Sequence, residues 1–249
     1  SIAAAMAAGI ASGFITAILQ TKMGINSLLA GIIVNTGLYS INIAVMSGSS
    51  ILNMNKTDTV FTKMAALVKG TPVARQSKLF VAIIAVAAVA VILGLFLKTR
   101  LGLAIRATGD NPDMVRSSSV NPAFTTIIGL CVANSFTALS GCLLAQSQRS
   151  VNIDIGTGMV TIALASLLIG GVFLGRKKMP LRIFGMVLGA FIFRLIYTIA
   201  LRFDMPAFML KFVSSVIVIA AIATPYFKKQ LPLLKRRIQT RSGRRKADA

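Results

Sequence analysis

The segment Leu79–Leu97 reads LFVAIIAVAAVAVILGLFL and contains no charged side chain. A membrane-spanning helix needs about 20 predominantly apolar residues, so this run is long enough to cross a bilayer. A strand of a membrane β-barrel would instead alternate apolar and polar residues over about 10 positions, and this run does not alternate. Leu79–Leu97 therefore predicts a transmembrane α-helix.

Other uncharged runs of similar or greater length lie on both sides of this segment, at residues 23–55, 117–148 and 155–175. Over all 249 residues, 55% are hydrophobic and 13% are charged. An average soluble domain has about 25% charged residues. This composition excludes a soluble enzyme, a disordered chain and a disulfide scaffold. It predicts an all-α, polytopic membrane helical bundle.

We expect about seven transmembrane helices in this chain. Their predicted bounds are 2–20, 28–47, 79–97, 124–146, 158–175, 182–202 and 209–226. They form one transmembrane domain over residues 1–227, with an inner loop at 98–123, an outer loop at 48–78 and a basic tail at 228–249. The first residue is Ser1, and no basic segment precedes the first apolar run, which does not resemble a signal peptide. We therefore expect a chain trimmed at its N-terminus.

The net charge is +21, from 27 basic and 6 acidic residues. Lys and Arg accumulate in cytoplasmic loops of membrane proteins, so the tail 228–249, with nine basic residues, is predicted to be cytoplasmic. If successive spans cross the membrane in opposite directions, starting from this cytoplasmic tail, eighteen basic residues lie inside and six outside. The other three lie in or beside spans. The positive-inside rule thus explains the charge, and we expect no nucleic-acid partner.

The outer loop contains one segment with helical spacing, Thr59–Lys69. Its apolar positions are Val60, Phe61, Met64, Leu67 and Val68. Lys63 and Lys69 lie off this stripe. Two interpretations remain open here: a short helix lying on the outer membrane surface or against the protein, and a solvated loop with one amphipathic turn.

Small residues recur four positions apart in three spans, as Gly9/Gly13, Gly171/Gly175 and Gly185/Gly189. Such pairs let helix backbones approach closely. We expect packing inside the bundle, with dimerisation of two copies through one of these faces as the alternative.

The two cysteines, Cys131 and Cys142, lie in one apolar run. Eleven residues of helix rise about 16 Å, beyond the Cα separation of about 7 Å that a disulfide tolerates, so they cannot pair within the helix. The chain has no histidine and no Cys/His cluster. We expect no metal site and no catalytic residues.

The inner loop reads KTRLGLAIRATGDNPDMVRSSSVNP from Lys98 to Pro122. Asn111 can cap a helix, Pro112 suits the first helical position, and Asp113 favours the positive end of the helix. We predict a helix of about two turns over Asn111–Ser119, entered by a turn at Gly109 and Asp110 and ended by Asn121-Pro122. So short a helix is unstable alone, which favours docking against a partner; the alternative is a solvated connecting turn.

The stretch Gly102–Asn121 closely resembles the inner-loop signature of permease subunits of ATP-binding-cassette importers, in the family of the branched-chain amino acid and ribose permeases. Residues 152–158 and 163–170 resemble the same family. Tyr197–Arg202, with Leu210-Lys211, looks most like the subgroup for aromatic amino acid uptake, such as tryptophan and tyrosine.

The resemblance implies a multi-pass permease of the bacterial plasma membrane that works with cytoplasmic ATPases, an extracellular substrate-binding protein and a second permease copy, as a homodimer. Family members usually have additional spans before this start. ATP and magnesium would bind the partner ATPase, with no cofactor in this chain. Gly170–Lys177 matches GxxxxG by chance, because Arg176 and Lys177 replace the residues a phosphate loop needs. The residues that would couple to the ATPase are Arg106, Gly109, Asp110, Asn111, Pro112, Asp113 and Arg116.

Polar residues inside spans are costly and tend to face a bundle interior or a cavity. The candidates for lining a translocation path are Asn35, Asn42, Asn134, Ser135, Ser140 and Arg194. The alternative for most of them is hydrogen bonding between helices. Arg194 has no acidic residue in any predicted span to pair with, which leaves backbone carbonyls, a cavity or snorkelling. Its position near mid-span favours a carbonyl or cavity contact.

Of four function classes, an ATP-driven permease for a small solute, an aromatic or branched-chain amino acid, fits the sequence best. A membrane enzyme or an ion-coupled transporter would need carboxylates or histidines in its spans, and the predicted spans have none. A scaffold protein would not need the capped inner helix. Within the importers, a ribose-type sugar or a nucleoside is the alternative solute.

Overall fold

The computed structural model describes residues 2–54, 59–62, 77–156, 159–174 and 179–202, together with isolated positions between 209 and 223. The chain divides into two compact units, residues 1–154 and residues 155–249.

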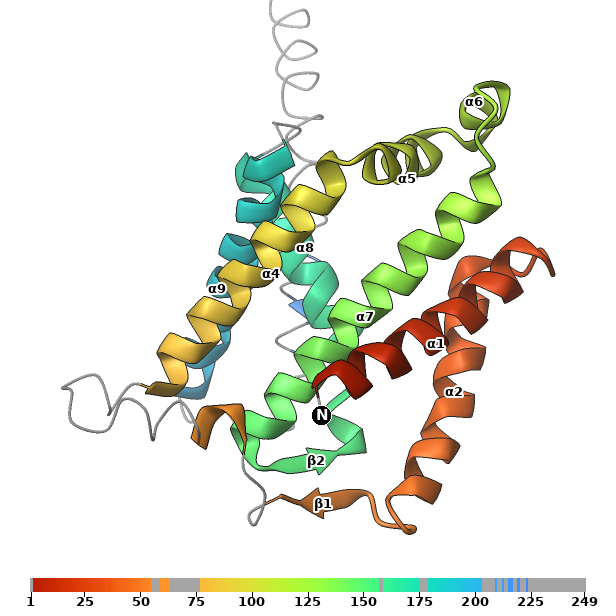
Figure 1. Cartoon of the computed structure of the whole chain (residues 1–249). Helices are drawn as coiled ribbons and strands as arrows, with labels where there is room; N and C mark the ends of the chain where they lie inside the picture. The colour runs from red at the N-terminus through yellow and green to blue at the C-terminus, as the bar shows by residue number, and fades with distance from the viewer. Residues whose placement is uncertain are drawn as a thin grey trace, which may run out of the picture. The chain divides into compact units, whose positions relative to one another are not determined.

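Among its described residues, the first unit contains the helices α1, α2 and α4 to α7, a short helical segment at residues 60–62 and a pair of short strands (Figure 1). Their bounds are α1 (Ile2–Thr21), α2 (Ser27–Val45), β1 (Ile51–Asn53), α4 (Ser77–Lys98), α5 (Arg100–Asp110), α6 (Pro112–Ser117), α7 (Pro122–Gln148) and β2 (Ser150–Asn152). A 3₁₀ turn (Ile153–Gly156) then leads into the second unit, which contains α8 (Met159–Leu174) and α9 (Met179–Arg202).

Five helices of the described chain are long and apolar enough to cross a membrane: α1, α2, α4, α7 and α9. The predicted all-α membrane bundle is therefore confirmed, with helix ends within a few residues of the predicted ones. The sixth predicted span, 158–175, forms α8, which at 16 residues is shorter than a typical spanning helix. The seventh, 209–226, lies for the most part outside the described residues.

Helix α1 packs along α7 through the predicted glycine pair (Figure 1). A Cβ atom at Gly9 would lie 2.5 Å from the carbonyl oxygen of Asn134, and one at Gly13 would lie 2.6 Å from that of Leu130. The two backbones are therefore in direct contact, as small residues allow. Because Gly9 meets a later α7 residue than Gly13 does, the two helices are antiparallel.

Helices α8 and α9 of the second unit pack in the same manner. A Cβ atom at Gly170 would collide with the carbonyl oxygen of Gly185, and one at Gly189 would collide with that of Ser166. The predicted Gly185/Gly189 pair is therefore a packing surface inside the unit. In α8 the close contact is made by Gly170, whereas a Cβ atom at Gly171 would have no described neighbour within 4 Å. Gly175 lies outside the described residues, so the Gly171/Gly175 pair stays a prediction.

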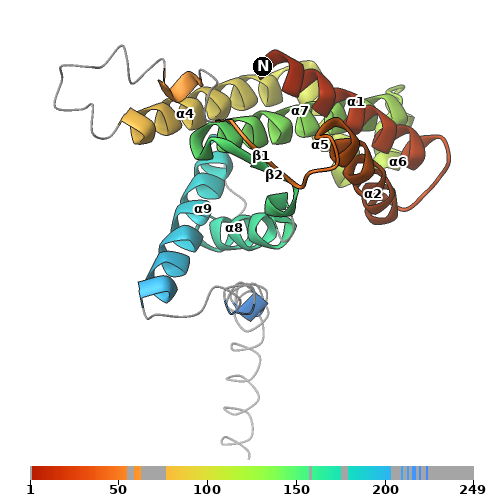
Figure 2. The same ribbon diagram turned by 90° about the horizontal axis from the view of Figure 1, so that it is seen from below.

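The loops after α2 and after α7 are joined by β1 and β2, which pair antiparallel with Ile51 opposite Asn152 and Asn53 opposite Ser150. Seen from below, this two-stranded sheet lies at the end of α7 (Figure 2). The start of the predicted outer helix lies there too: residues 60–62 are helical, and Thr59 and Phe61 are buried against the protein. Residues 63–69 of that prediction lie outside the described residues.

Candidate functional site

The predicted inner loop is largely helical and forms a two-helix element, α5 and α6, which we call the α5–α6 arm (residues 100–117). Two predictions about this loop were wrong. Gly109 and Asp110 end helix α5 instead of forming a turn, and Asn121-Pro122 begins α7 instead of ending α6. In the structure α6 ends at Ser117, and Ser119 has a left-handed backbone with φ of 61°.

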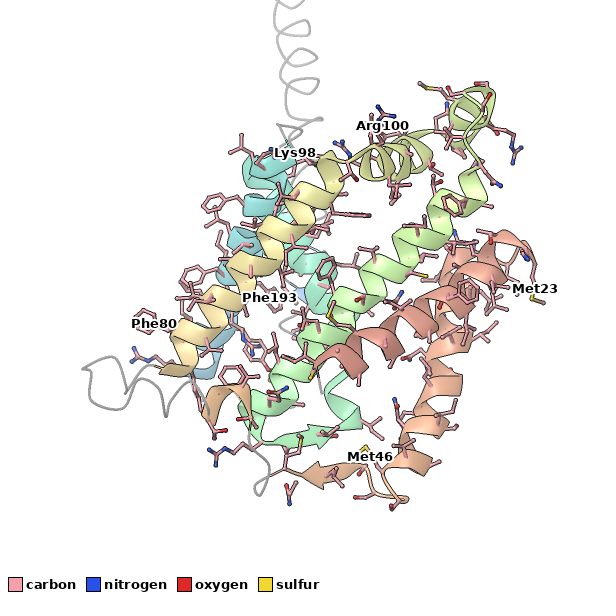
Figure 3. The ribbon with its side chains drawn as sticks, in the orientation of Figure 1. Met23, Met46, Phe80, Lys98, Arg100 and Phe193 are labelled. Carbon is pink, nitrogen blue, oxygen red and sulfur yellow. The ribbon has the colours of Figure 1, made fainter. Side chains whose placement is uncertain are left out.

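A tight corner joins α4 to α5. The Thr99 hydroxyl donates to the Phe96 carbonyl oxygen over 2.6 Å and accepts the Gly102 N–H over 3.2 Å, which caps α5. Gly102 is buried against the backbone of Phe96 and Leu97, where a Cβ atom would not fit. Figure 3 labels Lys98 and Arg100 on the two sides of this corner. This corner was not predicted, although Thr99 before a helical segment is an N-cap signal.

Arg106 braces the same corner from within α5. Its guanidinium donates to the Leu97 carbonyl oxygen over 3.1 Å and to the Gly102 carbonyl oxygen over 3.3 Å. Leu97 is in the last turn of α4, whose carbonyls have no helical partners of their own. Besides forming these hydrogen bonds, the positive guanidinium is attracted by the partial negative charge at the C-terminal end of α4. Arg106, predicted as a coupling residue, thus links the arm to α4.

The arm is also attached to α7. The hydroxyl groups of Thr108 and Thr125 lie 2.8 Å apart and share a hydrogen bond, and Thr125 is 1% exposed. One turn earlier on α5, Ile105 contacts α7 at Gly129, where a Cβ atom would lie 3.3 Å from the Ile105 side chain. The arm therefore contacts both long helices that flank it in the sequence.

Asn111 connects the two helices of the arm. Its backbone N–H donates to the Ala107 carbonyl oxygen at the end of α5, and its side-chain oxygen accepts the N–H groups of Asp113 and Met114, each over 3.1 Å. Pro112 occupies the first position of α6, so the predicted cap is confirmed. Val115 is buried at 4% exposure, whereas Met114 is 64% exposed. Asp113 and Arg116 are exposed as well, so α6 presents both charge and apolar surface.

The arm lies at one end of α7 and the β1–β2 sheet lies at the other (Figure 1). The 27 residues of α7 separate these ends by about 40 Å. Because α1 is antiparallel to α7, the short loop after α1 lies at the arm end. At the sheet end, the buried Gln146 side chain accepts the Val60 N–H over 3.0 Å, which attaches the segment after β1 to α7.

The residues predicted to line a path are not gathered around one described cavity. Asn35 and Asn42 are exposed on α2, Ser140 is exposed on α7, and Ser135 is buried on the same helix. The Asn134 amide donates to the Leu130 carbonyl oxygen of its own helix over 3.0 Å. The structure therefore leaves the path residues of the first unit as predictions.

Arg194 lies on α9 in the second unit and is exposed. Its guanidinium lies over the Tyr197 ring, with 5.8 Å from the guanidinium carbon to the ring centroid. Tyr197 was not among the predicted path residues, although an aromatic residue three positions after an arginine shares its helix face. Both predicted cysteines are free thiols on α7.

Several helices that are long and apolar enough to span a membrane, together with the α5–α6 arm at one end of α7, define a multi-pass membrane protein. Residues 1–222 match the family described as branched-chain amino acid transport system / permease component, and the chain belongs to this family. It is thus a permease of the transport-system type, as the inner-loop resemblance implied.

Curated relatives agree with this assignment. The chain is 31% identical to the tyrosine transport system permease protein of Clostridioides difficile (strain R20291), over 88% of this chain and 70% of that protein. It is 29% identical to an uncharacterized protein of Rickettsia prowazekii (strain Madrid E), over 67% of this chain and 56% of that protein. It is 23% identical to the autoinducer 2 import system permease protein LsrC of Yersinia enterocolitica serotype O:8, over 88% of this chain and 58% of that protein. No solved structure matches the chain.

Proposed function

We propose that this chain is the membrane subunit of an ATP-driven importer that carries an amino acid, with tyrosine and other aromatic amino acids as the first solutes to test. The solute class is proposed from the relative named for tyrosine transport, which is 31% identical over 220 residues. The family description, a branched-chain amino acid permease component, supports the same solute class.

The proposed power source is a separate cytoplasmic ATPase that docks on the α5–α6 arm. The exposed Met114 and the charges around it suit contact with a protein groove. The arm is hydrogen-bonded to α4 through Arg106 and to α7 through Thr108. A displacement of α6 would therefore be passed to both spans as a rigid-body movement.

The orientation follows from charge. The arm end would face the cytoplasm and the β1–β2 end the outside, because this arrangement puts eighteen basic residues inside and six outside. The basic tail would also be cytoplasmic. The remaining proposed partners are an extracellular substrate-binding protein, which would deliver the solute to the β1–β2 end, and a second copy of the permease, which would complete the path.

A sugar-type solute is the second candidate, because the autoinducer 2 import permeases match 88% of this chain. Their identity of 23% is lower than the 31% of the tyrosine permease, and for this reason we propose the amino acid first.

The test is uptake by the complete transporter, with the permease, its ATPase and its binding protein reconstituted in liposomes. Radiolabelled amino acids and ribose are supplied outside, with ATP inside. We expect ATP-dependent accumulation of an amino acid, with an aromatic one taken up best. Accumulation of ribose without any amino acid would contradict the proposal.

A further inference from the structure

Arg194 lies well inside the apolar part of α9. Arg182 precedes it by twelve residues and Arg202 follows it by eight, which corresponds to about 18 Å and about 12 Å of helix rise. The two flanking arginines mark the ends of the apolar stretch, so Arg194 is remote from both. An ionised side chain at such a depth is expensive unless it meets a partner or a water-filled cavity.

The face of α9 that packs on α8 does not include Arg194. Gly185, Gly189 and Phe193 recur every four residues, all three are buried, and both glycines contact the α8 backbone. Arg194 follows Phe193 by one position, about 100° further around the helix. Its guanidinium is therefore presented on another face, where it is exposed.

The guanidinium is positioned by an aromatic pair. The Tyr197 ring lies beneath it, and the Phe193 ring stacks on Tyr197 with 6.4 Å between centroids and 26° between planes. Phe193 is 1% exposed, so this stack is anchored in the helix packing. Figure 3 labels Phe193 at this point of α9. An arginine over a ring face keeps its N–H donors directed outward at its edges.

The predicted spans of this chain contain no negative charge that could pair with Arg194. All six acidic residues are aspartates, at positions 58, 110, 113, 154, 204 and 248, and none is in a predicted span. A second copy has the same spans and supplies none either. Within the described residues, no hydrogen-bond acceptor is bound to the guanidinium.

We propose that Arg194, held over Tyr197, binds the carboxylate of the solute as it crosses the membrane. The inference rests on the proposed function and names the side chain that makes the permease specific for solutes with a carboxylate. A guanidinium binds a carboxylate through two parallel hydrogen bonds, which a neutral sugar cannot match. An aromatic solute can in addition contact the Tyr197 ring, which is only partly buried.

The same donors could bind a phospholipid phosphate, so the experiment compares two solutes. Uptake of L-tyrosine and of L-tyrosinamide, whose carboxylate is a neutral amide, is measured with the complete reconstituted transporter. Every variant uses the same binding protein, so the selectivity of that protein cancels from the comparison. Arg194→Gln is the main variant, and Arg182→Gln, an exposed arginine at the start of the same helix, is the matched control.

We expect Arg194→Gln to lower the tyrosine-to-tyrosinamide uptake ratio by roughly 10- to 100-fold, the effect of losing hydrogen bonds to a charged group. Arg182→Gln should leave the ratio unchanged. Arg194→Lys should keep part of the preference for tyrosine, because it keeps the positive charge but loses the planar guanidinium that forms two parallel hydrogen bonds. Tyr197→Leu should lower the ratio and Tyr197→Phe should not. These two variants test the site even if Arg194→Gln fails to fold.

An unchanged ratio in Arg194→Gln, with tyrosine uptake retained by the wild type, would overturn the inference and leave the amino acid assignment standing. A phosphate contact predicts that result, because it would affect both solutes alike. If the wild-type transporter takes up ribose and no amino acid, the proposed function fails, and the inference fails with it.

Discussion

Gly9 lies where the α1 backbone touches α7, and its missing Cβ atom is what allows the contact. The nearest atom to that position would be the carbonyl oxygen of Asn134, 2.5 Å away. Helices in a membrane gain nothing by hiding apolar surface from lipid, so close backbone packing is their main source of attraction. Single glycines therefore determine where α1 meets α7 and where α8 meets α9.

Gly9→Ala should force the two helices apart. We expect a loss of stability of about 1–3 kcal/mol, the usual cost of overpacking, seen as a lower melting temperature of the purified protein in detergent. Gly37→Ala is the matched control, because a Cβ atom at Gly37 in α2 would have no neighbour within 4 Å. It should be neutral or slightly stabilising. Equal melting temperatures for the two variants would contradict this account.

The sequence predicts the presence of such glycine contacts better than their register. Gly9/Gly13 and Gly185/Gly189 form contacts as expected, but in α8 the contact falls on Gly170 and not on Gly171. Two adjacent glycines point about 100° apart on a helix, and only the partner helix decides which of them is used. Spacing within one helix does not contain that information.

At the scale of elements, the α5–α6 arm shows what local signals can and cannot reveal. The cap at Asn111 and the first position of Pro112 are local, so the start of α6 was predictable. The same Asn-Pro pattern at Asn121-Pro122 begins α7, because an Asn cap followed by Pro at the first helical position is a helix-start signal. The prediction that it ends the preceding helix was therefore wrong. Helix α5 was missed because two glycines interrupt its helix-forming residues, and its stability comes from the corner with α4 and from α7.

Arg106→Met tests whether the corner transmits movement. Methionine keeps an unbranched apolar stem but removes the bonds to the Leu97 and Gly102 carbonyl oxygens. We expect a small loss of stability, about 1–3 kcal/mol, and a larger number of ATP molecules hydrolysed per solute imported. The measurement is the ratio of ATPase rate to uptake rate in liposomes.

Arg100→Met provides the control for this variant, because Arg100 is exposed in the first turn of the same helix. Its ratio of ATP hydrolysed to solute imported should equal that of the wild type. If Arg106→Met also keeps the wild-type ratio, the corner has only a structural role.

For the whole molecule, the topology depends on contacts between residues far apart in the sequence. The bounds of the long helices follow from uncharged runs and were predicted within a few residues. The pairing of β1 with β2 joins segments about a hundred positions apart through strands of three residues each, and such strands have no detectable pattern of their own. The buried bond from Val60 to Gln146 is equally non-local.

Cysteine labelling of intact cells tests the orientation. Single cysteines are introduced at Ser242, in the basic tail, and at Ser50, beside β1, after Cys131 and Cys142 have been replaced by serine. We expect a membrane-impermeant thiol reagent to label Ser50→Cys and to leave Ser242→Cys unlabelled until the cells are opened. The reverse pattern would invert the whole topology, since the positive-inside rule is its only basis.

In the proposed mechanism, α6 passes a conformational change between a partner ATPase and the spans. The decisive variant replaces Asp110-Asn111-Pro112 with three glycines, which removes the cap, the preset φ of Pro112 and the stiffness of the joint. As a control, Lys22 and Met23 are replaced by glycine beside Gly24, in the short loop after α1. Both side chains are exposed, and Gly24 already has a positive φ of 67° in this loop.

The measurement is the ATPase rate of the assembled transporter in lipid discs, with and without the solute-loaded binding protein. We predict that the triple-glycine variant inserts and assembles normally but loses stimulation by the loaded binding protein, while the control in the loop after α1 keeps it. Full stimulation in the triple-glycine variant would show that α6 is only a connector and would contradict the account.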